Sequence, residues 1–355
     1  MRRRPTIREV AERAGCSVTT VSRVLNRVGR TAPATRARVE AAAAALDFRF
    51  DPLGRSLQAR RTRTIGAVVP TLANPVFAEA IGGAQAVVRA HGHQLLLACT
   101  DYDPAGEDDA VAALLAQRVA GLILTLADAA HDPALARPAS AGVPAVLLFN
   151  EAGAEDMPAV AVDNAAAAAR VAAEMAALGH RRTAYLAGRF RASDRSRRRF
   201  EGFRSGCEAA GLAEPVLVEV DFEAASHCDA LAALFARHPD VTALFCSNDL
   251  LGLRAIADLR ALGRAVPGAV SVAGFDGKAM AALAEPSLAT VATPARAMGH
   301  AAAEALFDAM EGAAPGQRLL AYEFRPGGSL APPPGGSAGR DAATSRPASS
   351  PVDPR

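Results

Sequence analysis

The chain has 355 residues, half of them hydrophobic and about a fifth charged, a composition typical of a folded globular protein with two or three domains. No apolar run approaches the roughly 20 residues of a membrane helix, and no apolar segment follows the basic start as in a secretory signal, so we expect a cytoplasmic protein without a membrane partner. The five cysteines are scattered and never form a C-x-x-C pair, so we predict free thiols, no metal site and no cofactor.

The net charge of +2 conceals a strong asymmetry along the chain. Residues 1–63 carry 15 arginines, no lysine and five acidic residues, a formal charge of +10, which leaves −8 for the remainder. A basic segment on an acidic body suggests a polyanion such as nucleic acid as the partner of that segment. From charge alone, an arginine-rich solvated surface is an equal alternative.

The first fifty residues have the pattern of three short helices. Thr6 and Glu9 form a T-x-x-E capping box, and Gly15 suits the left-handed turn that ends the first helix. Ser17 is placed to cap a second helix, and Pro33 suits the first turn of a third. The apolar faces of these helices consist of Ile7, Val10, Ala11 and Ala14, then Val21, Val24 and Leu25, then Val39, Ala42, Ala43 and Leu46.

A helix, a glycine turn and a second helix within about 20 residues form a helix-turn-helix unit. The second helix exposes short polar groups and one arginine, which can reach phosphates and base edges in a major groove. The alternative from periodicity alone is an ordinary three-helix bundle.

A family resemblance extends this interpretation. The run TIREVAERAGCSVTTVSRVLN, followed by TRARVEAAAAAL, resembles the DNA-binding head of the lac repressor/galactose repressor family. The resemblance implies that Val18, Thr19 and Arg23 read bases. It also implies phosphate contacts for Ser17, Thr20, Ser22 and Asn26, and we place Thr6 and Arg30 among the DNA-binding residues as well.

Residues 51–63 are predicted to join this head, residues 1–50, to the body. Their low apolar content is typical of a mobile basic linker. In the family the matching stretch forms a hinge helix on DNA and inserts a leucine into the minor groove, and Leu57 takes that position. Phe50 and Gly54 replace the usual proline and alanine of the family. Because glycine in a helix costs about 1 kcal/mol relative to alanine, we expect a hinge helix that depends on DNA.

Residues 64–325 alternate short apolar runs with alanine-rich helical segments. The predicted strands are 64–70, 94–100, 121–127, 144–150, 182–188, 216–221, 242–248 and 270–276, with a break near 160–164. Strands that are apolar throughout and alternate with helices indicate parallel sheets covered on both faces. We therefore predict an all-α helix-turn-helix head and an α/β, two-lobed periplasmic-binding-protein-like domain with two doubly wound parallel sheets.

Polar residues follow the ends of these strands. They are Asn74, Asp101, Asn150, Asp221, Asn248, Asp249 and Asp276. In open parallel sheets, ligands bind outside the carboxyl ends of the strands, so seven such residues favour a polar cleft between the lobes. For any single residue, a helix cap or loop start is the simpler explanation.

The family resemblance continues through the body, in ANPVFAEAIGGA, CSNDLLGLRAI, VSVAGFDGKAM and PSLATVATP. It implies effector contacts for Phe77, Asn150, Arg199, Phe222, Asn248 and Asp276, and we add Asp101. An arginine fork and an aspartate together can hold vicinal hydroxyls or a carboxylate. Gly277 stands where the family has a second aspartate, a difference that bears on the effector.

Six arginines lie between residues 189 and 199. They are compatible with an anionic effector, a sugar phosphate or acid, but we favour a solvated helical face from which only Arg199 points inward. Because the chain has no tryptophan, a sugar-stacking surface would require Phe77, Phe149 or Phe222.

Residues 326–355 are rich in Gly, Pro, Ser and Ala, which predicts a disordered tail. Together these features predict a sequence-specific transcriptional regulator, a repressor by expectation. It would bind a palindromic operator in double-stranded DNA as a homodimer, under the control of a small carbohydrate-like effector. The first alternative is a sugar-binding protein without DNA function, but this leaves residues 1–63 unexplained. The second is an enzyme, for which the sequence lacks a P-loop, a nucleophile elbow and a metal-spaced histidine cluster.

Overall fold

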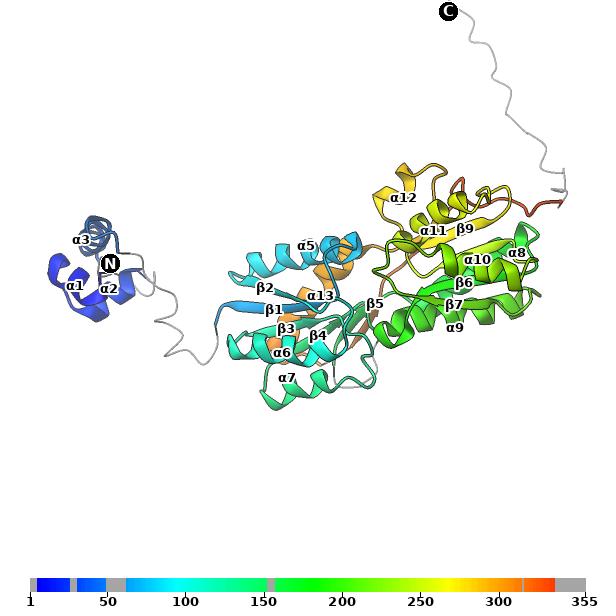
Figure 1. The fold of residues 1–355 in the computed structure, drawn as a ribbon. Coiled ribbons are helices and arrows are strands. Elements are labelled where there is room, and N and C mark those ends of the chain that lie inside the picture. Colours follow the sequence, from blue (N-terminus) through cyan, green and yellow to red (C-terminus); the bar gives the residue numbers. More distant parts are fainter. Residues whose placement is uncertain (1–4, 26–30, 49–61, 152–156, 315, 336–355) are drawn as a thin grey trace, which may run out of the picture. The chain divides into compact units, whose positions relative to one another are not determined.

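The computed structural model describes residues 5–25, 31–48, 62–151, 157–314 and 316–335 (Figure 1). The contacts divide the chain into two units, Met1–Thr62 and Arg63–Arg355, which we describe separately as the head and the body.

The described part of the head contains the three predicted helices, α1 (Ile7–Ala14), α2 (Val18–Leu25) and α3 (Pro33–Ala45). The predicted capping box is present, because the Thr6 amide donates to Glu9 Oε2 at 2.6 Å and the Glu9 amide donates to Thr6 Oγ1 at 3.4 Å. Gly15 ends α1 with a φ of 60°, a left-handed conformation that glycine adopts without strain. Valines from all three helices form the head core: Val10, Val21, Val24 and Val39.

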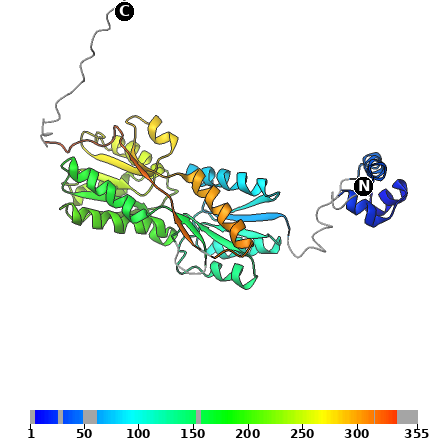
Figure 2. The ribbon, with the colours of Figure 1, turned by 180° about the vertical axis from the view of Figure 1, so that it is seen from behind.

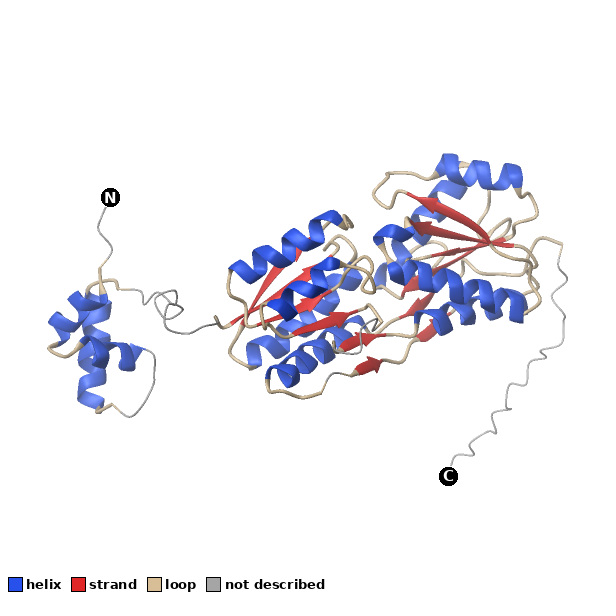
Figure 3. Ribbon diagram, turned by 90° about the horizontal axis from the view of Figure 1, so that it is seen from below, coloured by secondary structure: helices blue, strands red, loops and turns tan. Residues whose placement is uncertain are grey.

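The body has two lobes, each a twisted sheet between helices (Figure 3). The first lobe contains β1 (Thr64–Val69), α5 (Pro75–Ala90), β2 (Gln94–Cys99), α6 (Ala105–Ala116), β3 (Gly121–Leu124), α7 (Ala136–Ser140), β4 (Ala145–Leu148), β5 (Ala159–Ala161), α13 (Ala295–Met310) and β11 (Gln317–Leu319). The second lobe contains α8 (Asn164–Ala177), β6 (Thr183–Gly188), α9 (Asp194–Ala209), β7 (Val216–Val220), α10 (Cys228–Arg237), β8 (Ala243–Cys246), α11 (Asp249–Ala261), β9 (Ser271–Asp276), α12 (Ala279–Leu283), β10 (Ala289–Ala292) and β12 (Glu323–Arg325).

Each sheet has six strands among the described residues, in the orders β11-β5-β4-β3-β1-β2 and β12-β10-β9-β8-β6-β7. The pairs are parallel except β10 with β12, which are antiparallel. This confirms the predicted two-lobed α/β fold with doubly wound sheets. The chain crosses between the lobes after β5, before α13 and between β11 and β12, and α13 packs against α5 and the first sheet (Figure 2).

All eight predicted strands are present, but four further strands were missed. β5 is only three residues long and falls in the predicted break, and β10 is a four-residue strand for which no strand was predicted. β11 and β12 are short edge strands with mainly exposed side chains, so they carry no apolar run. None of the helices in the described part of the chain combines the length and the apolarity that a membrane crossing requires.

The prediction of a tail beginning at residue 326 is wrong for residues 326–335. Ser329 is buried, and its hydroxyl donates to the Val272 carbonyl at 2.6 Å and accepts from the Ala289 amide at 2.9 Å. The Ala331 carbonyl accepts from the buried His180 ring at 3.0 Å. Hydrogen bonds to the second lobe hold this segment, together with Leu330, which packs against the hydrophobic core, so its composition was misleading. Residues 336–355 lie outside the described residues.

Candidate functional site

The head presents one face of α2 to solvent. Val18, Thr19 and Arg23 are exposed, whereas Val21 and Val24 on the opposite face are buried in the head core. Val18 is 41% exposed and does not belong to the head core. These three side chains are the predicted base-reading residues, and the fold brings them together on one surface.

The predicted phosphate-contacting residues surround the start of this helix. Ser17 is exposed, and its hydroxyl accepts from the Thr20 amide at 3.1 Å and lies 2.9 Å from the Thr20 hydroxyl. Ser22 is half-buried, and Thr6 is exposed at the start of α1. The remaining predicted DNA-binding residues, Asn26, Arg30 and Leu57, lie outside the described residues.

The body contains a partly open cavity of about 530 Å³ where the two lobes meet. Segments that follow β1, β2 and β4 line it from the first lobe, and segments that follow β6, β7, β8 and β9 line it from the second, together with the first two turns of α9. This is the position that parallel sheets give to a ligand, and the volume suits a small molecule. Of the predicted effector residues, the cavity lining includes Phe77, Asp101, Arg199, Phe222, Asn248 and Asp276.

Arg199 lies in the second-lobe wall of the cavity, buried among polar and aromatic partners. Its Nε donates to Asn164 Oδ1 at 2.8 Å, and its Nη1 donates to the Ser247 carbonyl at 2.6 Å and lies 3.9 Å from Asp276 Oδ1. The guanidinium is stacked 3.6 Å above the Phe275 ring. Burial lowers the pKa of Arg199, while the Asp276 carboxylate opposes that shift. The guanidinium is therefore held in one orientation by groups of the protein itself.

Asp276 faces Arg199 from the end of β9. Burial raises the pKa of this carboxyl, and the charges of Arg199 and Lys278 oppose the shift. Its neighbour Asp249 does not line the cavity: it accepts from the Thr290 hydroxyl at 2.5 Å and from the Lys278 amide at 2.7 Å. Burial and the Asp276 carboxylate raise the pKa of Asp249 to about 7. Asp249 therefore holds the loop after β9, whereas Asp276 lines the cavity, with Asn74 as a hydrogen-bond partner of its carboxyl.

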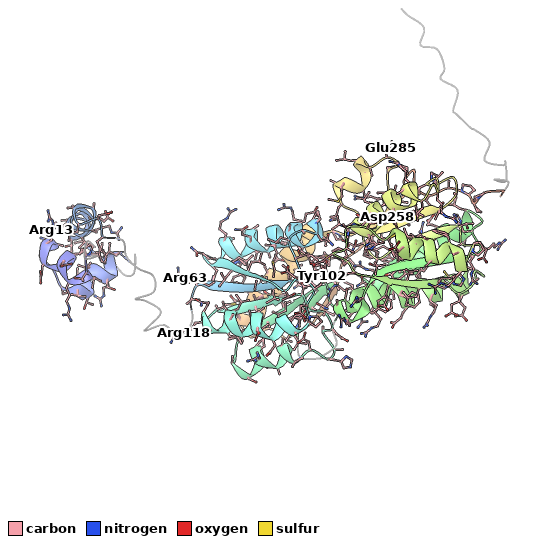
Figure 4. All side chains as sticks on the ribbon, in the orientation of Figure 1. Arg13, Arg63, Tyr102, Arg118, Asp258 and Glu285 are labelled. Carbon is pink, nitrogen blue, oxygen red and sulfur yellow. The ribbon has the colours of Figure 1, made fainter. Side chains whose placement is uncertain are left out.

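Aromatic rings from both lobes meet at the cavity. Tyr102 of the first lobe lies between the lobes (Figure 4), 4.9 Å from the Phe222 ring of the second lobe and 6.4 Å from Phe77. Phe149, the third predicted stacking candidate, also lines the cavity. Tyr102 was missed by the sequence analysis, although it stands between Asp101 and Asp103 directly after a predicted strand.

Asn150 is placed differently from the prediction. It is fully buried outside the cavity lining, and its amide donates to the Leu126 carbonyl and to both carboxylate oxygens of Asp194, at 2.9 to 3.0 Å. Asp194 begins α9 in the other lobe, and its backbone amide donates to the Ala127 carbonyl at 2.6 Å. Asn150 therefore joins the two lobes rather than facing the cavity.

Two arginines of the run at 189–199 are buried in the cavity wall, not one. Arg195 is 4% exposed and lines the cavity beside Arg199, while Arg189 and Arg191 lie exposed at its rim. The expectation that only Arg199 points inward is therefore wrong. Arg195 and Arg199 are four residues apart, which places both on the same face of α9.

Glu107 is buried in the first lobe, next to the segment at Ala127 that contacts Asp194 of the second lobe. Its Oε1 accepts from the Ala127 amide at 2.8 Å, and burial together with the Asp132 carboxylate raises its pKa to about 9. Glu107 is therefore protonated at neutral pH. Among the described residues, no group of three or more His, Cys, Asp or Glu side chains could hold a metal ion.

We expect Glu107→Gln to change how stability depends on pH. A carboxyl whose pKa is raised by folding contributes stability that is complete below its unfolded pKa of about 4.5 and is lost as the pH rises towards 9. In the wild type the free energy of unfolding should fall by at most about 1.4 kcal/mol per pH unit between pH 5 and 8 through this group. Glu107→Gln should remove that slope in chemical denaturation, whereas Glu208→Gln, at an exposed carboxylate, should retain it. Parallel profiles for Glu107→Gln and wild type would contradict the assignment.

With both surfaces described, comparison with known proteins identifies the family. Residues 6–50 match the family model of bacterial regulatory proteins of the lacI family, and residues 172–330 match a periplasmic binding protein-like domain. The chain is 32% identical to the HTH-type transcriptional regulator GntR of Escherichia coli K12 over 333 residues, which are 93% of this chain and 99% of that relative. The chain belongs to the lacI family of bacterial regulatory proteins.

Solved structures agree with this lacI-family assignment. A transcriptional regulator CelR–cellobiose complex matches with a TM-score of 0.69 and 32% identity, over 92% of this regulator and 100% of that chain. A lac repressor dimer bound to operator and the anti-inducer ONPF matches with a TM-score of 0.82 and 25% identity, over 93% and 100%. The regulator is thus a transcription factor with a helix-turn-helix DNA-binding head, as predicted.

The structure also explains why this lacI-family regulator departs from the family at Gly277. Its φ is 67°, and a Cβ atom there would lie 2.3 Å from the Cα of Ala292. Aspartate can adopt this φ, but a side chain at position 277 would require the backbone of Ala292 to shift, so Asp276 is the only acidic residue of that pair at the cavity.

Proposed function

We propose that this regulator binds a palindromic operator as a homodimer through the exposed face of α2, and that a carbohydrate or carbohydrate derivative in the interlobe cavity controls the affinity. The lac repressor structure contains a dimer on operator DNA, and the CelR structure contains cellobiose, which supports both parts of the proposal. A two-fold dimer presents two identical heads, so its operator should have two matching half-sites. We further propose that the protein acts on DNA in the cytoplasm, as a repressor, without enzymatic turnover of the effector.

The observation that carries the proposal is the buried Arg199–Asp276 pair in a cavity built from both lobes. A rigid donor fork opposite an acceptor can hold adjacent hydroxyl groups, and flanking aromatic rings can cover the apolar face of a sugar. Asn248 adds a polar group to the same cavity.

Contacts between the lobes provide the means of control. Lys278 Nζ of the second lobe lies 2.7 Å from Glu79 Oε2 on α5, and Arg198 Nη1 on α9 lies 3.1 Å from Glu151 Oε2. A ligand that binds both lobes would change their closure and therefore these ion pairs. A coupling of only about 1–3 kcal/mol between cavity and head is sufficient for regulation.

The experiment is a gel shift of the full-length protein on its own upstream DNA, with and without ligands identified by thermal shift. We expect a sequence-specific complex whose affinity changes with a carbohydrate ligand that is recovered unaltered. Sequence-independent binding that salt abolishes would contradict the DNA part. Binding that no carbohydrate or carbohydrate derivative changes would contradict the effector part.

A further inference from the structure

Arg195 lines the effector cavity and has an unsatisfied donor atom in its guanidinium group. Its Nη1 donates to the Leu126 carbonyl at 2.6 Å and lies 3.2 Å from Asp194 Oδ1, so this half of the guanidinium is held in place. Its Nη2 is buried and has no hydrogen-bond partner within the part of the chain that the structure describes. A buried charged donor without an acceptor is costly, so this atom indicates a missing ligand group.

The charges around Arg195 specify that group. Asp194 lies outside the cavity lining, and its carboxylate is shared with the Asn150 amide and with the Ala129 amide at 3.4 Å. The buried charged residues that line the cavity are thus Arg195, Arg199 and Asp276, two cations and one anion. The pKa of Arg199 is lowered mainly by burial and, in part, by the charge of Arg195, which indicates that the two guanidinium groups interact.

The start of α9 adds to this positive potential. Arg195 lies in the first turn of a 16-residue helix, and Ser193, which caps it, also lines the cavity. The amino end of such a helix carries a partial positive charge and favours an anion. The second observation, the unpartnered Nη2 at the same place, distinguishes this helix start from an ordinary one.

The rim of the cavity has the opposite charge. Four exposed acidic residues line it, against two exposed arginines. The acidic residues are Asp101, Asp103, Asp221 and Glu223, and the arginines are Arg189 and Arg191. This rim disfavours a ligand with several negative charges, so the ligand should carry a single anion directed at Arg195 and hydroxyl groups elsewhere.

We propose that Arg195 binds a carboxylate of the effector, so that the ligand class is a polyhydroxylated monocarboxylate, a sugar acid, rather than a neutral sugar. The inference rests on the proposed function, because it assigns the ligand of the same cavity. The planar fork of arginine matches the two oxygens of a carboxylate, while Asp276 and Asn248 remain for the hydroxyl groups.

The test is calorimetry of the full-length protein with matched ligand pairs. In the first arm, hexonates are compared with the neutral alditols of the same carbon skeleton. In the second arm, hexuronates are compared with the neutral aldoses. Hexose 6-phosphates form a third arm. We expect the acid of at least one pair to bind at least about tenfold more tightly than its neutral partner. If the neutral partners bound equally or more tightly than the acids, the inference would be overturned and the proposed function would stand. The same holds if a hexose 6-phosphate bound more tightly than every acid. Binding of no compound in any arm would contradict the proposed function itself.

Substitutions test whether Arg195 is responsible for the preference for the acid. Arg195→Gln should weaken binding of the acid about 10- to 100-fold and change binding of its neutral partner less than about threefold. Arg204→Gln, which removes a charge from an exposed position of the same helix, should change neither. Arg195→Lys keeps the charge but lacks the planar fork, and it should give an intermediate loss of affinity for the acid. If Arg195→Gln does not fold, Arg195→Lys serves as the test instead. An acid affinity unchanged in the folded variants would overturn the assignment.

Discussion

Arg23→Ala is expected to reduce operator affinity by about 100-fold or more while leaving effector affinity unchanged. Arg23 is exposed on the outward face of α2, beside Val18 and Thr19, so its removal does not open the head core. A bidentate arginine–base contact contributes about 1–3 kcal/mol of discrimination, and a dimer would lose two of them. Together these losses correspond to about two orders of magnitude in affinity.

Gel shifts at several salt concentrations measure this effect, with Arg38→Ala as the control. Arg38 is an exposed arginine on α3, so the control removes the same charge from another face of the head. If the two variants lost affinity equally, the contribution of Arg23 would be a general charge effect, and α2 would not be the reading helix.

The fold was largely predictable because the interior strands of both sheets are continuous apolar runs. β3, β4, β8 and β9 are buried along their whole length, so they differ from every loop in composition. Edge strands lack this signal: β11 consists of exposed residues and pairs only with β5. Its position follows from the second crossing of the chain between the lobes, before α13, which no local pattern encodes.

The site was predictable where a residue type and a strand end coincide, as for Asp276 and Asn248. Asn150 satisfies the same rule but is buried against the other lobe, because the rule cannot distinguish a cavity wall from an interlobe contact. Arg195 was missed because a dense arginine run resembles a solvated face. Its four-residue spacing from Arg199 was the available signal, whereas Arg197 and Arg198 form ion pairs with Asp128 and Glu151 of the other lobe.

Asp276→Ala and Arg199→Ala are expected to have the opposite effect to Arg23→Ala: operator binding persists, but it no longer responds to the effector. Removing one member of a buried ion pair leaves the other uncompensated and costs about 3–5 kcal/mol of stability, so the isosteric Asp276→Asn is the safer companion variant. Loss of charged hydrogen bonds to the ligand, each worth about 1.5–3 kcal/mol, predicts a fall in effector affinity of about 100-fold or more. Operator affinity without effector should stay within about threefold of wild type.

Calorimetry with the effector and gel shifts with and without it separate these two quantities. Asp229→Asn is the control, because Asp229 is an exposed carboxylate on α10 that does not line the cavity. If a folded Arg199→Ala or Asp276→Asn protein still changed its operator affinity on addition of effector, the effector would have to bind at another site. Loss of both activities together in a folded variant would instead mean that DNA binding depends on the internal packing of the second lobe. Arg199 joins α9 to the segment after β8 through the Ser247 carbonyl, and to β9 through Phe275 and Asp276.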